Sequence, residues 1–257
     1  MFAPRSVLVT GANRGIGFGL VRQLLSLPSP PKYIFACCRV PEDAEELQKL
    51  ADLNPSIKVL KIDLLDTASI KASAEIVEET VGDDGLNVLI NNAGTLQDTY
   101  AHRFDDITEE RLKSTFAANT VGTTMMIKTF LPLVRRASNQ IADDKFDSSR
   151  AAIYTIASKW SSVSDIEQRL GFYWYTYCMS KAAINMMIRL FCQELRCNNE
   201  NILCVNLEPG WVKTRIGTSA GLLTPDEAAK ALFEFVATLT DAHHGCFYTC
   251  EGNECPF

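Results

Sequence analysis

Val7-Leu-Val-Thr-Gly-Ala-Asn-Arg-Gly-Ile-Gly-Phe-Gly-Leu20 is the stretch that decides the fold of this 257-residue chain. Residues 7–9 form a short apolar run, which is typical of a buried central strand. Glycines at positions 11, 15 and 17 then lead into a predicted helix over residues 18–27. Glycine lets the backbone approach a phosphate closely, and a helix N-terminus attracts the phosphate charge. The stretch therefore predicts a phosphate-binding turn, although a tight turn that merely needs three glycines would have the same sequence.

Apolar runs alternate with amphipathic segments along the rest of the chain. Further strands are predicted at residues 33–38, 57–62, 87–90, 151–157, 201–207 and 245–249. Helices are predicted at residues 42–53, 67–81, 108–137 with a break near 120–122, 175–197, and from the Thr224 cap onward. This order predicts an α/β fold, in which a doubly wound, Rossmann-type parallel sheet lies between two layers of helices. We expect residues 1–257 to form a single domain, with the polar segment 138–150 as a mobile surface insertion.

The composition excludes several classes of protein. Hydrophobic residues make up 47% of the chain, which excludes a mainly disordered state. A net charge of −6 argues against nucleic acid as a partner. No apolar run approaches the roughly 20 residues that span a bilayer, so no membrane association is expected. The first predicted strand begins so close to Met1 that no signal peptide is expected. The nine cysteines are then most simply free thiols, and a cytoplasmic location is predicted.

Polar residues or glycines follow the predicted strands at their carboxyl ends. In a doubly wound sheet, ligands bind at this edge, near the point where the strand order reverses. The residues at these ends, in chain order, are Gly11, Arg39, Asp63, Asn91 to Gly94, Ser158, and Pro209-Gly210. Their common position predicts one binding site along this edge of the sheet.

Tyr177 and Lys181 are the strongest candidates for catalysis. They are four residues apart on a predicted helix, so their side chains lie on one face. A neighbouring ammonium favours the phenolate and lowers the pKa of a tyrosine, which makes it a usable proton carrier. An exposed aromatic–lysine pair of no function would have the same spacing.

These motifs occur in the order found in the short-chain dehydrogenases/reductases, and the chain resembles this family over nearly its whole length. The matching residues are Thr10-Gly-Ala-Asn-Arg-Gly-Ile-Gly17, Asp63-Leu64, Asn91-Asn-Ala-Gly94, Asn119, Ser158, Tyr177-x-x-x-Lys181 and Pro209-Gly210. In finer detail, residues 19–25, 85–89 and 209–214 are similar to the sniffer-type carbonyl reductases and the related C-factor proteins.

The resemblance implies a role for each matching residue. Tyr177 would donate a proton to a substrate carbonyl oxygen, to which Ser158 would also hydrogen-bond. Lys181 would lower the pKa of Tyr177 and hold the nicotinamide ribose, and Asn119 would anchor a water of the proton relay. The implied cofactor-binding residues are Gly11, Asn13, Arg14, Gly15, Ile16, Gly17, Arg39, Asp63, Leu64, Asn92, Ala93, Gly94, Tyr177, Lys181, Pro209, Gly210, Val212 and Thr214.

Two arginines predict that the cofactor is NADPH. A site for NAD usually has an acidic residue at the end of the second strand, where this chain reads Cys37-Cys38-Arg39. Arg39 offers a planar fork of donors to a 2′-phosphate, and the resemblance puts Arg14 beside the same phosphate. Two solvated surface arginines are the alternative interpretation. No metal is expected, because the spacing of His243-His244 and the nearby cysteines 246, 250 and 255 fits zinc poorly.

Two features depart from the family pattern. Ala157-Ser158 stands where two serines are usual, and the span from Ser158 to Tyr177 is unusually long. The aromatic residues 172–175 in this span are interpreted either as a wall for an aromatic substrate or as loop packing or a subunit contact. The resemblance also implies a homo-oligomer, most simply a dimer, formed through the helices near residues 108–137 and 175–197.

The sequence therefore predicts an NADPH-dependent carbonyl reductase that acts on a small aldehyde, ketone, quinone or α-dicarbonyl. Two alternatives stay open. One is a dinucleotide-binding signalling protein of C-factor type, whose turnover is incidental. The other is an alcohol dehydrogenase that works in the oxidative direction.

Overall fold

The computed structural model describes residues 2–96, 103–140, 146–166 and 173–257. Its centre is a parallel sheet of seven strands in the order β3-β2-β1-β4-β5-β6-β7. The strands are β1 (Ser6–Thr10), β2 (Tyr33–Cys38), β3 (Ile57–Lys61), β4 (Val88–Asn91), β5 (Ala152–Ile156), β6 (Leu203–Glu208) and β7 (Phe247–Thr249). The strand order reverses between β1 and β4, as it does in a doubly wound sheet. The predicted fold class is confirmed.

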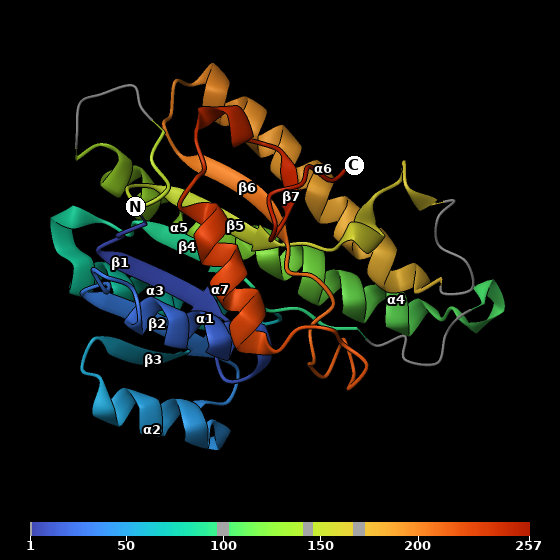
Figure 1. Cartoon of the computed structure of the whole chain (residues 1–257), viewed down its shortest axis with the longest axis horizontal. Coiled ribbons are helices and arrows are strands. Elements are labelled where there is room, and N and C mark those ends of the chain that lie inside the picture. Colours follow the sequence, from blue (N-terminus) through green and yellow to red (C-terminus); the bar gives the residue numbers. More distant parts are fainter. Residues whose placement is uncertain (1, 97–102, 141–145, 167–172) are drawn as a thin grey trace.

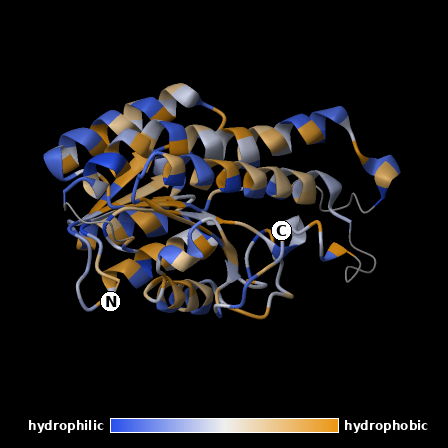
Figure 2. Ribbon diagram, turned by 90° about the horizontal axis from the view of Figure 1, so that it is seen from above, coloured by the Kyte–Doolittle hydropathy of each residue, from blue (hydrophilic) through white to orange (hydrophobic). Residues whose placement is uncertain are grey.

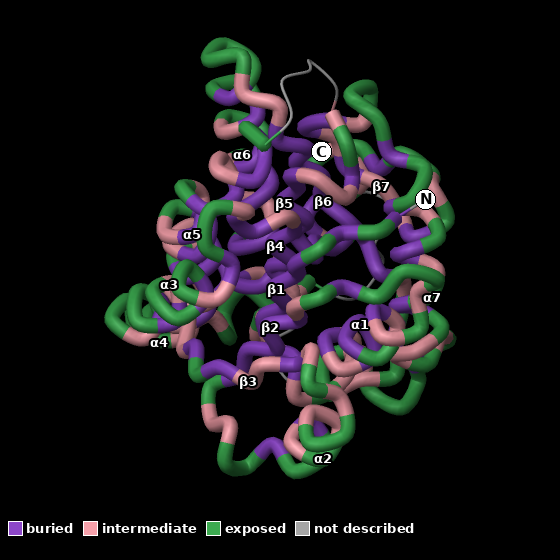
Figure 3. Tube along the Cα trace, turned by 90° about the vertical axis from the view of Figure 1, so that its left-hand side faces the viewer, coloured by how far each residue is buried: buried purple, intermediate pink, exposed green. Residues whose placement is uncertain are grey.

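Helices cover both faces of this sheet, which gives three layers (Figures 1 and 3). One face carries α3 (Thr67–Val81), α5 (Thr123–Ser138) and α6 (Tyr175–Cys197). The other face carries α1 (Gly15–Leu25), α2 (Glu45–Leu53) and α7 (Pro225–Val236). Among the described residues, no helix combines the length and apolarity needed to cross a bilayer.

Alternation along the strands divides the core into two clusters. Val7 and Val9 of β1 pack toward α1 and α7, whereas Leu8 between them packs toward α3 and α5. Because both faces are covered, every residue of β1 is buried. Figure 2 shows the result, with hydrophobic residues on the strands and the inner helix faces and hydrophilic residues outside.

The long helix predicted at residues 108–137 consists of three parts. α4 (Glu109–Phe116) is capped by the Thr108 hydroxyl, a π-helical segment spans Ala117–Gly122, and α5 follows. The predicted break near 120–122 therefore exists, as a widened helical turn rather than an interruption. A Cβ on Gly122 would lie 2.5 Å from the carbonyl oxygen of Leu64, so only glycine fits this contact. The π-helical segment is thereby held against the loop that follows β3.

Several predicted boundaries differ from the observed ones. α1 begins at Gly15, inside the glycine turn, rather than at residue 18. A short 3₁₀ turn (Pro41–Asp43) precedes α2, whose predicted start was residue 42. β6 continues to Glu208, because Glu208 pairs in register with Thr249 of β7. In the predicted insertion at 138–150, residues 141–145 lie outside the described residues, and the carbonyl of Ser148 accepts a hydrogen bond from the buried Tyr154 hydroxyl.

Candidate active site

The glycine turn after β1 is fastened to the loop after β4 by a network of hydrogen bonds. The Thr10 hydroxyl accepts from the backbone N–H groups of Asn92 and Ala93, each at 3.0 Å. The Asn92 amide nitrogen donates to the Thr10 carbonyl at 2.8 Å. These bonds join the two strands at the point where the strand order reverses. The predicted residues Gly11, Asn92 and Ala93 are therefore in contact.

The glycines of the turn are required by close contacts. A Cβ on Gly17 would lie 2.2 Å from the carbonyl oxygen of Gly11, which no side chain tolerates. Gly15 has a φ of +55°, and a Cβ there would lie 3.2 Å from the Thr214 methyl group. Thr214 thus lies against the glycine turn, although about two hundred residues separate them in the chain. The alternative of an idle tight turn does not account for this meeting of three loops.

The other predicted cofactor residues also lie on loops at this edge. They are Asn13 on the glycine turn, Asp63 and Leu64 after β3, Gly94 after β4, and Pro209, Gly210 and Val212 after β6, while Ile16 lies in the first turn of α1. The loop after β6 is held by a parallel bridge between Val212 and Leu223. All these residues therefore lie at the carboxyl ends of the parallel strands.

Arg14 and Arg39 are both exposed and form no ion pair with any described residue. Arg14 is the N-cap residue of α1, and its side chain makes no capping hydrogen bond. The first backbone N–H groups of α1 therefore have no side-chain cap from this residue. A helix N-terminus beside unpaired guanidinium groups fits a phosphate group.

Tyr177 and Ser158 meet at the carboxyl end of β5. Tyr177 is 8% exposed, and the Ser158 hydroxyl hydrogen-bonds its phenol. Burial, followed by the nearby Glu208 carboxylate, raises the pKa of Tyr177, and only the Ser158 bond opposes this rise among the leading causes. The phenol is therefore held in its protonated form.

Lys181 lies on the same face of α6 as Tyr177. Its Nζ donates to the Ile156 carbonyl at 2.7 Å and lies 5.9 Å from the centre of the Tyr177 ring. Burial lowers the pKa of Lys181 to about 8. The expected lowering of the Tyr177 pKa by Lys181 is not observed, because burial and Glu208 dominate at the phenol. The pair is buried, so the alternative of an exposed aromatic–lysine pair is wrong.

Asn119 fixes the segment that follows Gly94. Its side-chain amide exchanges two hydrogen bonds with the backbone of Thr95, at 2.8 and 2.9 Å, and also donates to the Ser180 hydroxyl at 3.0 Å. A Cβ on Gly94 would lie 3.2 Å from Asn119 Oδ1 and 3.7 Å from Lys181 Nζ. Asn119 therefore ties the loop after β4 to α6 beside the lysine.

A chain of hydrogen bonds between buried polar side chains ends at the backbone carbonyl of Ser158. Asn206 of β6 donates to Asn185 of α6 at 2.9 Å, and Asn185 donates to Ser161 at 2.7 Å. Ser161 donates in turn to the Ser158 carbonyl at 2.5 Å. These three residues were not predicted from the sequence. The sequence feature that could have identified them is a polar side chain on an otherwise apolar face, such as Asn206 within the apolar run of β6.

Glu208 is a further site residue that was not predicted from the sequence. It ends β6, is 7% exposed, and its carboxylate accepts a hydrogen bond from the backbone N–H of Lys159. Burial raises the pKa of the Glu208 carboxyl to about 7. A buried carboxylate next to a predicted catalytic serine is an unusual feature, because burial disfavours its charge.

Aromatic side chains gather at the start of α6. The rings of Trp160 and Trp174 meet edge to face with centroids 4.8 Å apart, and those of Phe104 and Tyr175 do so at 5.8 Å. Phe172, which belonged to the predicted cluster, lies outside the described residues. Trp174 and Tyr175 pack on rings from other segments, in agreement with the loop-packing interpretation, whereas the exposed Tyr173 packs on Tyr175 within the cluster.

His244 lies next to two cysteines other than those that follow it in the sequence. They are Cys192 and Cys204, and the three potential ligand atoms are within 4.8 Å of one another. The Cys204 N–H donates to His244 Nδ1 at 3.3 Å, and Nε2 lies 3.1 Å from the Cys192 carbonyl oxygen. Both ring nitrogens therefore have backbone partners.

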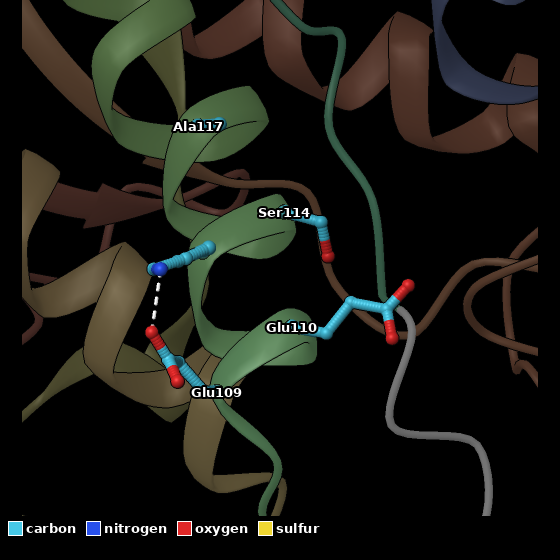
Figure 4. A pocket seen from close by; sticks show the side chains of 5 residues that line it. Glu109, Glu110, Ser114 and Ala117 are labelled. Atoms are coloured by element: carbon cyan, nitrogen blue, oxygen red, sulfur yellow. Dashed lines mark ion pairs between the residues drawn. The ribbon is translucent and has the colours of Figure 1, made fainter.

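An open hollow of about 560 Å³ on the surface of α4 is separate from these residues (Figure 4). It is lined by Glu109, Glu110, Lys113, Ser114 and Ala117, and the dashed line marks the ion pair between Glu109 and Lys113. None of these five residues belongs to the predicted site. The hollow is a solvated helix surface rather than a catalytic cavity.

The arrangement at the sheet edge is suited to proton transfer next to a bound dinucleotide. The Tyr177 phenol, the Ser158 hydroxyl and the Lys181 amine meet at the carboxyl end of β5 and the first two turns of α6. The glycine turn follows the carboxyl end of β1, at the same end of the parallel strands. Such groups can protonate and hydrogen-bond an oxygen on which negative charge develops.

Comparisons with known proteins agree with this geometry. A family model described as short chain dehydrogenase matches residues 5–222. The NADPH-bound carbonyl reductase from chicken fatty liver is 37% identical, with a TM-score of 0.92 and full coverage of both chains. Carbonyl reductase Sniffer of D. melanogaster is 33% identical, with a TM-score of 0.93, and the alignment covers 99% of this chain and all of that one. An uncharacterized oxidoreductase of Schizosaccharomyces pombe is 30% identical over 97% of this chain and 96% of its own length.

The matched region contains the glycine turn, the Ser158, Tyr177 and Lys181 set, and the loop after β6. The predicted family and the predicted likeness to sniffer-type carbonyl reductases are confirmed. This chain belongs to the short chain dehydrogenase family of oxidoreductases.

Proposed function

We propose that this protein is an NADPH-dependent carbonyl reductase. The observation that carries the proposal is the buried, protonated Tyr177 phenol, which is hydrogen-bonded to Ser158 and lies near the Lys181 amine. A general acid must reach the substrate with its proton and have a group nearby that stabilises its conjugate base, and the Lys181 amine can serve as that group. The printed titles of the chicken and fly relatives, both carbonyl reductases, support the same reaction type.

In the proposed reaction, the side chains act on the carbonyl oxygen. When bound, NADPH supplies the hydride to the carbonyl carbon. Tyr177 donates its phenolic proton to the oxygen, and the Ser158 hydroxyl hydrogen-bonds the same oxygen as charge develops. Lys181 holds a positive charge close to the phenol and stabilises the phenolate that remains. Asn119 keeps the Gly94–Thr95 segment in place beside Lys181.

NADPH is proposed over NADH because of the charges near the glycine turn. Arg14 and Arg39 are exposed and free of ion pairs with described residues, and the strand that precedes Arg39 ends in buried cysteines. A guanidinium group forms strong, charge-assisted hydrogen bonds with a phosphate. The chicken relative was crystallised with NADPH, which supports this choice.

The substrate is proposed to be a small aldehyde, ketone, quinone or α-dicarbonyl. Aromatic rings at the start of α6, among them Trp174 and Tyr175, lie a few residues from Tyr177. They favour substrates with an apolar or aromatic body next to the carbonyl. The buried polar support of Ser158 favours an enzyme over a C-factor-type binding protein, because cofactor binding alone does not require it. The oxidative direction uses the same groups in reverse.

A homodimer is proposed through α4 and α6. Met179, Met186 and Leu190 form an exposed apolar row on α6 at spacings of seven and four residues, which lie on one helix face. A hollow of about 410 Å³ lies along the same row, lined by Ala183, Met186, Met187, Leu190, Phe191 and Glu194. An apolar row of this kind is typical of a protein interface. A cytoplasmic location remains a prediction.

The proposal is tested with purified protein, NADPH and a panel of carbonyl compounds. The panel contains 4-nitrobenzaldehyde, 9,10-phenanthrenequinone, menadione and 2,3-butanedione, and the readout is NADPH oxidation together with product identification. We expect at least one aromatic carbonyl to be reduced with a kcat/KM of about 10⁴ M⁻¹s⁻¹ or more. If the protein binds NADPH but none of the panel is reduced, a binding function replaces the proposed activity.

A further inference from the structure

Glu208 occupies a position that strand geometry directs toward the catalytic helix. Side chains alternate along β6, so Cys204, Asn206 and Glu208 point to the same face of the sheet. Cys204 lies in the core cluster shared with α6, and Asn206 hydrogen-bonds Asn185 of α6. Glu208 is the last member of this row, at the carboxyl end of the strand. Its carboxylate therefore faces the active-site end of α6.

The carboxylate joins two loops of the proposed active site. It accepts hydrogen bonds from the backbone N–H groups of Lys159 and Gly210. Lys159 directly follows Ser158, and Gly210 lies on the turn after β6, where its φ is +80°. The backbone of Glu208 is fixed as well, because its carbonyl accepts from the Cys250 N–H at 2.8 Å. The side chain thus connects the serine turn with the predicted cofactor turn.

We propose that Glu208 is a positioning residue whose carboxylate holds the Ser158–Lys159 turn in place and puts a negative charge beside the hydrogen-bonded Ser158 and Tyr177 pair. This inference rests on the proposed carbonyl reductase function. A negative charge close to the phenol opposes formation of the phenolate, so Tyr177 remains a proton donor to higher pH. The same charge is compatible with the protonated amine of Lys181.

The electrostatic surroundings support this assignment. Glu208 is the second largest cause that raises the pKa of Tyr177, after burial. It also acts against the lowering of the pKa of Lys181 by burial. The titratable groups around Glu208 and Tyr177 are the amines of Lys159 and Lys181 and the thiols of Cys178, Cys250 and Cys255. The pKa of the last two thiols is raised to about 12 and about 11, so both are neutral near pH 7.

The two parts of the role are separated by three variants of Glu208. Glu208→Gln keeps an oxygen that accepts from Lys159 but removes the charge. Glu208→Asp keeps the charge but shortens the side chain, and Glu208→Leu removes both. Glu251→Gln is the matched control, because Glu251 is a nearby carboxylate that is exposed.

The experiment measures kcat/KM from pH 6 to pH 10.5 for NADP-dependent oxidation of 4-nitrobenzyl alcohol, or of the alcohol from the panel's fastest carbonyl. The positively charged nicotinamide of bound NADP would favour the phenolate that oxidation requires, so log kcat/KM rises with pH and levels off at the apparent pKa of Tyr177 in that complex. We expect the Gln variant to level off about one pH unit lower than the wild type, whereas the Asp variant and the Glu251→Gln control should level off at the same pH as the wild type. The Leu variant should lose at least about tenfold in kcat for carbonyl reduction through misplacement of Ser158.

The outcomes distinguish the Glu208 assignment from the proposed function. A wild-type protein with no turnover in either direction contradicts the carbonyl reductase proposal itself. If the wild type is active and its profile levels off at the same pH as that of the Gln variant, the Glu208 assignment is overturned and the carbonyl reductase proposal stands. If the Gln variant does not fold, as judged by thermal unfolding and NADPH binding, the Asp variant decides. A shifted profile in the charge-retaining Asp variant overturns the assignment, and an unshifted profile with reduced kcat supports it.

Discussion

The Nζ of Lys181 donates a hydrogen bond to the carbonyl of Ile156, with an N–O distance of 2.7 Å. Ile156 is the last residue of β5 and Lys181 is in the second turn of α6, so this bond fixes the helix relative to the strand end. It also directs a buried amine toward the edge of the sheet where the candidate site lies. The first prediction follows from this contact.

Replacement of Lys181 by Met should impair both catalysis and cofactor binding. The substitution removes the amine that we propose stabilises the phenolate and binds the nicotinamide ribose, and it leaves the Ile156 carbonyl without this donor. We expect kcat/KM for carbonyl reduction to fall by about 100-fold or more, and the Kd for NADPH to rise. Lys128→Met, on the exposed side of α5, is the control. Unchanged NADPH affinity, measured by fluorescence titration, would contradict the proposed ribose contact.

Exchange of the residues at the end of β2 should change the cofactor preference. In the wild type we expect kcat/KM with NADPH to exceed that with NADH by at least about tenfold, because each charge-assisted hydrogen bond contributes about 1.5–3 kcal/mol. Cys38→Asp combined with Arg39→Ala should shift the preference toward NADH, since the new carboxylate repels the 2′-phosphate. Arg22→Ala is the control, because Arg22 pairs with Asp226 on the surface. Equal use of both cofactors by the wild type would refute the assignment.

The buried carboxyl of Glu208 should make stability depend on pH. Burial raises its pKa from 4.5 to about 7, so the folded state binds this proton more tightly than the unfolded state. The resulting stabilisation is fully present below pH 4.5 and is lost as the pH rises through about 7. The shift corresponds to about 3 kcal/mol. Urea unfolding of the wild type and Glu208→Gln at pH 5 and pH 8 tests this sign: the wild type should lose stability relative to the variant at the higher pH.

The apolar row on α6 should determine the oligomeric state. We expect sedimentation to show a dimer at micromolar concentration, and the double change Met186→Glu with Leu190→Glu to produce a monomer. Both side chains are exposed by more than half in the single chain, so the change costs little folding stability. A wild type that sediments only as a monomer would remove the proposed interface.

The fold was predictable because its signals are local. The apolar runs of β1, β2 and β4 are buried on both faces, and the glycine turn is dictated by contacts such as that of Gly17 with the Gly11 carbonyl. The bounds of α3 and α6 agree with the prediction, and the Asp66 cap and Gly82 mark the ends of α3. Tyr177 and Lys181 were identified from their spacing of four residues, and Ser158 from its position after the fifth strand and from the family resemblance.

The supporting residues of the site could not be predicted in this way. Asn206, Asn185 and Ser161 come from three elements, and their hydrogen bonds exist only after the sheet and α6 pack. Glu208 precedes a Pro-Gly turn, where a charged residue is normally a solvated one. Its burial results from the pairing of β6 with β7 and from the hydrogen bond that its carboxylate accepts from the Lys159 N–H. Such long-range consequences have no periodic signal in the sequence.

The central claim is that Tyr177 donates the proton in NADPH-dependent carbonyl reduction, and Tyr177→Phe tests it most directly. The variant keeps the buried ring and removes only the hydroxyl that bonds to Ser158. The measurement is kcat/KM for reduction of the best carbonyl substrate, with NADPH affinity and thermal unfolding as checks on the fold. We predict a fall of about 100- to 10,000-fold with NADPH still bound. A folded Phe variant that reduces the substrate within about twofold of the wild-type rate would contradict the claim.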